Sequence, residues 1–381
     1  MKVTQVYEII NGIAKELVGD EAVVQEDLSN VVDVGNAIFG AASVDNYVKK
    51  LVDHIGKVIF VNRPYSGSVP SVMMDGWEYG AVLEKISADI PEASENESWS
   101  LEDGKSYDQD VFYQPKVEAK FFSQKVTFEV DMSFTEKQVK GSFSSASQLN
   151  GFLSMLYNAV EKAMTLRMDG LVMRTINNMT ALTINDDKTG IRAVNLLTAY
   201  NSKFSASLTA AEAVTNPEFI RFASMTMQLY IDRLSKMSTL FNAGGKQRFT
   251  PADALHVVML SDFKAAAGAY LQSDTFNEQY VALPNAETVP YWQGSGKDYA
   301  FASVSTIHVK ANDGKTDGGV EVNQSGILCV MFDRDALGVC NVDRRVTTNF
   351  NAKAEFFNNY YKFDAGYFND TNENFVVFFV A

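Results

Sequence analysis

The stretch that decides the fold of this chain runs from residue 144 to residue 181 and reads SSASQLNGFLSMLYNAVEKAMTLRMDGLVMRTINNMTA. Its apolar positions recur every three or four residues, which is the pattern of one buried stripe on an α-helix. A helix over this stripe would be about 45 Å long at 1.5 Å per residue. We therefore expect one long helix that packs its apolar stripe across a broad surface. The stripe consists of Leu149, Leu153, Leu156, Val160, Met164, Met168, Leu171, Thr175 and Met179.

Length and composition place the chain among globular proteins with hydrophobic cores. It has 381 residues, of which 46% are hydrophobic, so two or three compact units are expected. The formal net charge of −14 disfavours a nucleic-acid-binding surface, because neutralising phosphates requires clustered Lys and Arg. The chain shows no secretory signal pattern and no apolar run of membrane-spanning length. We expect a soluble protein made in a reducing cytoplasm, with Cys329 and Cys340 as small buried thiols.

An acidic segment follows the first quarter of the chain. Between Asp89 and Asp110 there are eight acidic residues, one Lys and few aliphatic residues, so this run cannot pack a core of its own. One interpretation is a solvated loop. Trp99 lies in its middle, however, and a Trp in such a loop needs a surface to lie on. That surface could belong to another chain.

Strict alternation of apolar and polar residues from Val126 to Phe134 predicts a half-buried antiparallel strand. The preceding residues, 110–122 (DVFYQPKVEAKFF), are the candidate hairpin partner, with Pro115 favouring an edge position. The two segments predict a long two-stranded arm with an acidic tip. Since an isolated two-stranded ribbon is marginal in water, we expect the arm to be stabilised mainly by docking elsewhere.

The second half of the chain mixes helices and strands. Residues 208–241 predict helices, the longer one beginning at Asn216-Pro217, where Pro suits the first turn. Residues 256–260 predict a buried strand, followed by a short helix capped at Ser261 and Asp262. The order of elements indicates a compact α/β unit. Further strands are expected at 303–310 (SVSTIHVK), 326–333 (GILCVMFD), 350–356 and 375–380 (FVVFFV).

Motifs for catalysis or metal binding are weak or fail. The glycine–lysine turn at 294–297 is followed by Asp298, whose carboxylate would repel a phosphate. The turn at 313–319 has two carboxylates but lacks the ligand series of a calcium loop. Met225, Met227 and Met237 are interpreted as core residues and not as metal ligands. We assign no catalytic, cofactor-binding or metal-binding residue and expect no cofactor. The histidines, interpreted as structural, are His54, His256 and His308.

Three stretches carry a resemblance to a known family. They are residues 43–86 (SVDNYVKKLVDHIGKVIFVNRPYSGSVPSVMMDGWEYGAVLEKI), 128–143 (FEVDMSFTEKQVKGSF) and 326–368 (GILCVMFDRDALGVCNVDRRVTTNFNAKAEFFNNYYKFDAGYF). In these stretches, and in the order of its elements, the chain resembles the major capsid proteins of tailed bacteriophages, which have the HK97-like fold. It is most similar in texture to those of phages that infect Gram-positive hosts.

The resemblance implies an α+β fold with an N-terminal arm, an extended β-hairpin called the E-loop, a peripheral domain with a long spine helix, and an α/β axial domain. The implied divisions are an N-terminal arm with helices at 1–74, the E-loop at 75–135, the peripheral domain at 136–190, the axial domain at 191–340, and C-terminal strands returning to the peripheral domain at 341–381.

The function implied by the resemblance is a non-enzymatic shell protein of the virion. It would assemble in the host cytoplasm into pentamers and hexamers of an icosahedral head around double-stranded DNA. Its implied partners are other copies of itself, a separate scaffold protein and a portal protein, with only weak non-specific DNA contact and no membrane. Alternatives that remain open are an encapsulin-like nanocompartment shell, a phage tail structural protein and a cytoplasmic enzyme. Some family members cross-link an arm lysine, but nothing in the surroundings of Lys105 singles it out for that chemistry.

Overall fold

The structure is a computed structural model. It describes residues 69–74, 82–135, 146–272, 286–292, 305–311 and 319–381. Most of the N-terminal arm expected at 1–74 lies outside these residues, and so do His54, the turn at 294–297 and most of the turn at 313–319. Within the part of the chain that is described, no helix is long and apolar enough to cross a membrane.

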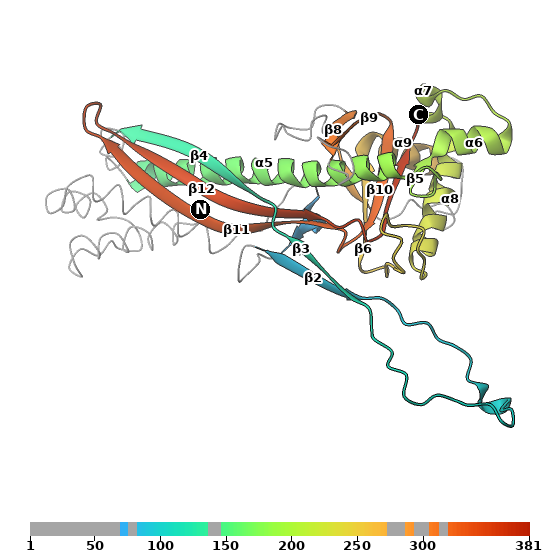
Figure 1. The fold of residues 1–381 in the computed structure, drawn as a ribbon. Helices are drawn as coiled ribbons and strands as arrows, with labels where there is room; N and C mark the ends of the chain where they lie inside the picture. Colours follow the sequence, from blue (N-terminus) through green and yellow to red (C-terminus); the bar gives the residue numbers. More distant parts are fainter. Residues whose placement is uncertain (1–68, 75–81, 136–145, 273–285, 293–304, 312–318) are drawn as a thin grey trace.

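The long helix is present as α5, Ala146–Asp186 (Figure 1). Its predicted stripe is confirmed wherever side chains are described, since Val160, Met164, Met168, Leu171, Thr175 and Met179 are all buried. The second half of the helix is buried on further sides as well. Strands β4 (Lys125–Thr135), β11 (Leu337–Asn351) and β12 (Phe356–Asn369) contact the helix, and so do β8 (Ile307–Ala311), β9 (Val320–Gln324) and β13 (Phe375–Phe379). A helix covered from more than one direction is a central element of the core and does not lie at the surface.

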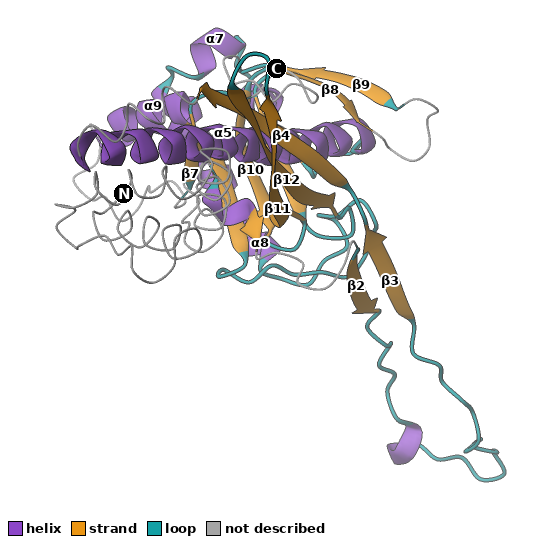
Figure 2. Ribbon diagram, turned by 90° about the vertical axis from the view of Figure 1, so that its left-hand side faces the viewer, coloured by secondary structure: helices purple, strands orange, loops and turns teal. Residues whose placement is uncertain are grey.

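A four-stranded sheet runs along the helix in the order β1-β11-β12-β4 (Figures 1 and 2). The alternation predicted for β4 is confirmed: Phe128 is buried, and Thr127 and Glu129 are exposed. The sheet consists of β1 (Met73–Met74), β4 (Lys125–Thr135), β11 (Leu337–Asn351) and β12 (Phe356–Asn369), and a short 3-10 helix, η1 (Pro70–Val72), precedes β1.

The hairpin partner predicted for β4 was wrong. β4 pairs with β12 along its whole length and not with residues 110–122. The physical reason is burial of the apolar face of β4: the ring of Phe128 lies 5.3 Å from that of Phe363 on β12, between the sheet and the helix. A partner more than 200 residues away therefore covers this face better than the neighbouring segment does.

The strand predicted through residues 350–356 was also wrong. The chain turns there, and the turn joins β11 to β12. The side chain of Asn351 accepts hydrogen bonds from the backbone N–H groups of Lys353 and Ala354, and Glu355 has φ of 53°. Such Asn side-chain bonds define turns. In the sequence, the alternation of residue types continues through this turn, so it did not reveal where the strand ends.

The second, five-stranded sheet has the order β5-β13-β10-β6-β7, and the central β10 is buried along its whole length. The last predicted strand, β13, lies in this sheet beside β10 and not with β11 and β12. Helices surround this part of the molecule (Figure 2). The strands are β5 (Ala193–Asn195), β6 (Leu255–Leu260), β7 (Glu287–Val289), β10 (Ile327–Asp333) and β13 (Phe375–Phe379). The helices are α6 (Leu196–Phe204), α7 (Ala210–Ala213), α8 (Pro217–Leu234) and α9 (Ser261–Gln272).

Helix α8 begins as predicted, because the side chain of Asn216 accepts from the N–H groups of Glu218 and Phe219. It ends at Leu234, earlier than expected. Met225 and Met237 are 55% and 49% exposed, so their interpretation as core residues was wrong, whereas Met227 is buried. A separate hairpin of β8 (Ile307–Ala311) and β9 (Val320–Gln324) packs on α5.

Truncating the buried side chain of Ile176 tests the central role of α5. Ile176 is fully buried. We expect Ile176→Ala to lower the free energy of unfolding by about 2–5 kcal/mol, because it leaves a cavity between packed layers. Leu166→Ala is the matched control on the same helix, since Leu166 is 41% exposed, and it should cost less than about 1 kcal/mol. Denaturant unfolding of both variants measures the difference, and equal losses would contradict this account of the helix.

Candidate assembly site: the projecting arm

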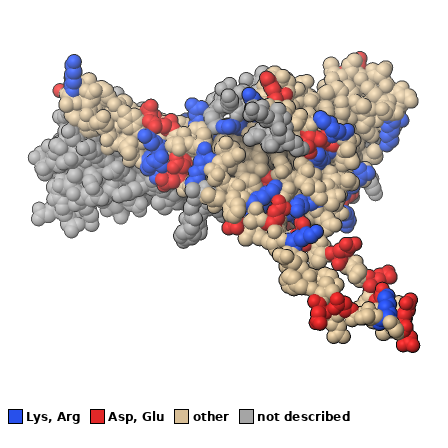
Figure 3. Space-filling model, in the orientation of Figure 1, with Lys and Arg blue, Asp and Glu red and all other residues tan. Residues whose placement is uncertain are grey.

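An arm projects from the body (Figures 1 and 2). Its base is an antiparallel pair of strands, β2 (Leu83–Ala88) and β3 (Val117–Phe122). The chain between them has no further strand, and every residue from 90 to 116 is exposed. Red acidic side chains dominate this region in Figure 3. The predicted acidic-tipped arm is therefore present, although its two-stranded part is confined to the base and uses β2 in place of β4.

The β2–β3 hairpin partly reverses the arrangement of an ordinary surface hairpin, although the apolar Leu83 and Phe122 at one end of its inward face are half-buried. Lys85 and Lys120, opposite each other in the pairing, are half-buried and face the body. The apolar side chains of Ile86, Val117 and Phe121 are 67%, 61% and 65% exposed. A soluble hairpin normally turns its apolar face to the core and its polar face to water. This reversal indicates that the outward face is covered by something outside the single chain.

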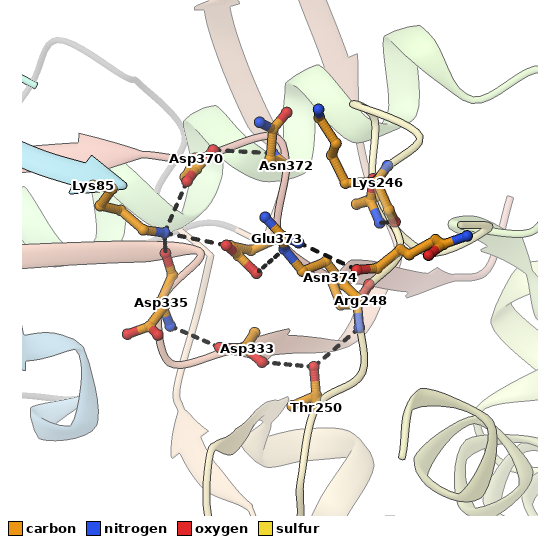
Figure 4. Close-up of polar contacts among 12 residues, drawn as sticks. Lys85, Lys246, Arg248, Thr250, Asp333, Asp335, Asp370, Asn372, Glu373 and Asn374 are labelled. Atoms are coloured by element: carbon orange, nitrogen blue, oxygen red, sulfur yellow. Dashed lines mark hydrogen bonds and ion pairs between the residues drawn. The ribbon is translucent and has the colours of Figure 1, made fainter. Parts of the chain in front are cut away.

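The hairpin is held to the body by ion pairs on one carboxylate (Figure 4) and by the ring of Phe122, which lies 5.1 Å from that of the buried Phe368. The Nζ atoms of Lys85 and Lys120 lie 2.8 and 2.9 Å from the two carboxylate oxygens of Asp370, whose side chain is only 3% exposed. Lys85 also donates to the backbone carbonyl of Asp335 at 2.8 Å and lies 3.4 Å from Glu373. We call Lys85, Lys120 and Asp370 the arm clamp.

The charge state of Asp370 follows from its partners. Burial by itself would raise the pKa of Asp370, but hydrogen bonds from Lys85 and Lys120 outweigh it, so the pKa lies below the ordinary value of 3.8. The carboxylate is thus charged at neutral pH. It lies between two lysines and reduces their repulsion across the hairpin.

A second set of contacts supports the clamp from the loop at 235–249. Lys246 bridges Asp89 and Glu118 at 3.0 and 2.8 Å, and Arg248 lies 3.3 Å from Glu373. The hydrogen bonds that Lys246 donates to the carboxylates of Glu118 and Asp89 raise the pKa of Lys246.

Beneath the clamp, a buried network fixes the turn at 370–374. The hydroxyl of Thr250 donates to Asp333 at 2.7 Å, and the amide of Asn374 donates to Thr250 at 3.1 Å (Figure 4). The backbone N–H of Asn372 donates to the Asp370 carboxylate at 3.0 Å. Buried hydrogen bonds of this kind restrain the groups that they connect, although Oδ1 of Asn374 has no partner among the described residues. Asp370 is therefore held in place for the arm.

The tip of the arm is ordered by its own contacts. A short 3-10 helix, η2 (Glu97–Trp99), is capped by Asn96, whose side chain accepts from the N–H of Ser98 at 2.8 Å. Lys105 pairs with Glu97 at 2.6 Å. On this small frame the side chain of Trp99 is 99% exposed. An aromatic residue presented in this way is the usual anchor of a protein–protein contact.

The residues weighed for chemistry in the sequence are not brought together. His256 lies on β6 with its ring 5.6 Å from that of Phe332, and His308 lies on β8. Cys329 and Cys340 are free and buried, as predicted. Among the described residues, no group of three or more His, Cys, Asp and Glu side chains is placed to hold a metal ion.

The arm clamp was missed at the sequence level. Lys120 and Asp370 are 250 positions apart, so no local pattern links them. One partial signal was available: charged and apolar residues alternate over residues 117–120 (VEAK), but in LEKISA at 83–88 the charged Glu84 and Lys85 are adjacent and point to opposite faces of the strand. The sequence cannot say which alternating set faces inward.

Known structures with this fold are those of phage capsids. A chain from the capsid of Staphylococcus phage Andhra superimposes with a TM-score of 0.54 at 9% identity, covering 84% of this chain and 86% of that one. A chain from a structure of native bacteriophage P68 superimposes with a TM-score of 0.52 at 8% identity, with the same coverage of 84% and 86%. The fold is the α+β, HK97-like fold of phage capsid proteins.

The sequence places the chain within that class. A sequence model of the Phi29-like phage major capsid proteins matches residues 10–379. The chain belongs to this family and is a structural protein of a phage shell. A comparison with curated proteins found no significant match.

Replacing Asp370 by Asn tests the arm clamp. Asp370→Asn should remove the carboxylate shared by Lys85 and Lys120 and leave Lys85 with Glu373 alone, and we expect the hairpin to detach more easily by about 1–3 kcal/mol. Hydrogen exchange of the β2 and β3 amides measures this opening. Asp335→Asn is the control, because Lys85 binds the backbone carbonyl of that residue and not its side chain. Unchanged exchange in Asp370→Asn would contradict the clamp.

The clamp should also respond to pH. The folded-state pKa of Asp370 is below its unfolded value, so its stabilisation is complete above about pH 4 and is lost as the pH falls through the folded-state pKa. We therefore expect hydrogen exchange of the β2 and β3 amides in the wild type to accelerate as the pH falls below about 4. The rates are corrected for the intrinsic pH dependence of exchange. In Asp370→Asn this acceleration should be absent. A wild-type profile identical to that of Asp370→Asn would contradict the assignment.

Proposed function

We propose that this capsid protein assembles into pentamers and hexamers of an icosahedral phage head that encloses double-stranded DNA, and that the arm joins neighbouring copies. The observation that carries the proposal is the arm itself: its outward face is apolar, and its ordered tip presents Trp99 to solvent. These groups have no partner surface within the described part of the chain. Another copy of the chain supplies one in a shell.

The energetics of the arm favour assembly with other copies over a monomeric protein. A two-stranded ribbon has little stability of its own. Here the arm clamp anchors its base, and the ordered tip carries little conformational entropy cost when it docks. An arm that gains its remaining stability by binding a neighbour is expected to have a preorganised tip and an exposed apolar surface.

The structure also supports a proposed division of the chain into domains. We assign residues 75–135 to the E-loop arm, 136–190 to a peripheral domain built on α5, and 191–340 to an axial domain around the five-stranded sheet. The C-terminal segment 341–381 contributes β11 and β12 to the sheet beside α5, and β13 to the five-stranded sheet. The turn at 370–374 connects β12 to β13 and thereby joins the two sheets. Asp370 of the arm clamp lies in this turn.

The proposed partners follow from the shell function. We propose a separate scaffold protein and a portal protein, assembly in the host cytoplasm, and no catalytic activity. DNA contact is proposed to be weak and non-specific, and the formal net charge of −14 supports this, because a wall of that charge does not retain DNA by phosphate neutralisation.

Removing the tip tests the proposed role of the arm. We expect a chain in which residues 92–108 are replaced by a flexible linker of equal length to stay folded but to assemble poorly, because the linker keeps the connection and removes the contacts. Trp99→Ala should weaken assembly in the same direction, and Trp99→Phe should restore part of it. Electron microscopy and sedimentation measure shells, with scaffold protein supplied if the wild type needs it.

Circular dichroism of the same variants checks that the subunit is folded. Normal shells from the linker variant would contradict the role given to the arm. A wild-type chain that stays monomeric under all salt conditions, with and without scaffold, would contradict the shell function itself.

A further inference from the structure

The loop between α8 and β6 has a defined shape of its own. The N–H of Ser238 donates to the carbonyl of Arg248 at 2.9 Å, and the N–H of Arg248 donates back to Ser238 at 3.0 Å. Inside the loop that this pair closes, the side chain of Asn242 accepts from the N–H of Lys246 at 2.8 Å and donates to its carbonyl at 2.7 Å. We call residues 238–248 the strap.

The strap is attached to the body through its backbone. The carbonyl of Phe241 accepts from the N–H of Phe375 at 2.9 Å, and the N–H of Gly244 donates to the carbonyl of Thr371 at 3.0 Å. A Cβ atom at Gly244 would overlap the side-chain oxygen of Asn372, which is only 7% exposed. This close approach therefore requires glycine, and it fixes the position of the strap on the body.

From this position the strap reaches both strands of the arm. The Nζ atom of Lys246 lies 3.0 Å from the carboxylate of Asp89, which follows β2, and 2.8 Å from that of Glu118 in β3. Glu118 lies two residues farther out along the hairpin than Lys120 of the arm clamp, or about 7 Å at about 3.3 Å per residue. Among the described ion pairs between arm and body, those of Lys246 therefore lie farthest out.

The two contact points have opposite polarity. At the arm clamp the hairpin supplies the cations, Lys85 and Lys120, and the body supplies the carboxylate of Asp370. At the strap the hairpin supplies the carboxylates and the body supplies Lys246. A hairpin shifted by two residues in either direction would bring like charges together, Lys120 to Lys246 or Glu118 to Asp370. Because like-charge contacts are unfavourable, the two points select one position of the hairpin.

The two contact points also differ in strength. The side chain of Asp370 is 3% exposed, whereas those of Asp89 and Glu118 are 40% and 43% exposed. Salt screens exposed ion pairs much more than buried ones. The strap contact therefore opens first, while the arm clamp stays closed.

We propose that the strap sets the direction of the arm, as a second and releasable fixation point. One fixation point leaves the arm free to turn about it, whereas two points define a direction. With the ion pairs of Lys246 formed, the arm keeps one direction, and with them open it turns about the arm clamp. The device lies within one subunit. Its use in assembly rests on the proposed shell function, because an arm with one direction loses less conformational entropy when it binds a neighbour.

Distances between spin labels test the strap in single subunits. The labels are placed on Ser94→Cys in the arm and Ser202→Cys on α6, both exposed, and the natural Cys329 and Cys340 are buried. Double electron–electron resonance gives the distribution of this distance in the full-length chain, at a dilution at which sedimentation shows monomers. We expect a narrow peak at low salt. At about 1 M salt, where the Debye length is about 3 Å, the peak should broaden.

Variants of the labelled chain separate the strap from the arm clamp. Lys246→Met should lose the narrow peak at low salt and respond to salt no further. Gly244→Val, which displaces the strap and leaves Lys246 in place, should lose it as well. Lys236→Met is the matched control: it removes the same charge from an exposed lysine two residues before the strap, and it should keep the narrow peak. Hydrogen exchange of the β2 and β3 amides should stay slow in all three variants, because the arm clamp remains.

A narrow peak in Lys246→Met would overturn the proposal, and so would a broad peak at low salt in the chain that keeps Lys246. A narrow peak in Gly244→Val would overturn the role given to that glycine. Fast exchange of the β2 and β3 amides in Lys246→Met would overturn the independence of the two contact points. None of these outcomes affects the proposed shell function, because no assembly is measured. A wild-type chain that never forms shells would overturn the shell function and leave the strap intact.

Discussion

Burial of α5 from more than one direction is the constraint on which the rest of the structure depends. Around Leu171 and Ile176 the helix contacts the four-stranded sheet as well as β8, β9 and β13. A helix of this length has to be covered along its whole apolar surface, and no contiguous segment can do that. Strands from the beginning and the end of the described chain therefore meet on it. This meeting brings the turn at 370–374 beside the base of the arm.

The arm uses a different kind of stabilisation from the body. The body is held by apolar packing, with β10 and the inner face of β12 buried, whereas the arm base is held by Lys85, Lys120 and Asp370. Ion pairs on a buried carboxylate depend on geometry more than on area. As a result, the apolar face of the hairpin remains free for another subunit. An arm anchored by its own apolar face would have had nothing left to offer a neighbour.

Prediction succeeded where the deciding forces are local. The stripe from Val160 to Met179, the alternation of β4 and the cap at Asn216 each depend on residues a few positions apart. It failed where a distant segment competes with a near one. β4 pairs with β12 because Phe363 covers Phe128, and the alternation at 350–356 hid a turn that Asn351 closes. Met225 matched the helical stripe yet lies on the exposed side of α8.

The sequence by itself determined the long helix, the strand character of most segments, the acidic tip and, through its resemblance, the family. These properties follow from periodicity and composition, which are written in consecutive residues. Only the tertiary structure decided which face of the β2–β3 hairpin points outward and which carboxylate holds its base. Those facts depend on partners such as Lys85 and Asp370, which are 285 positions apart, and spacing along a chain carries no information about contacts at that separation.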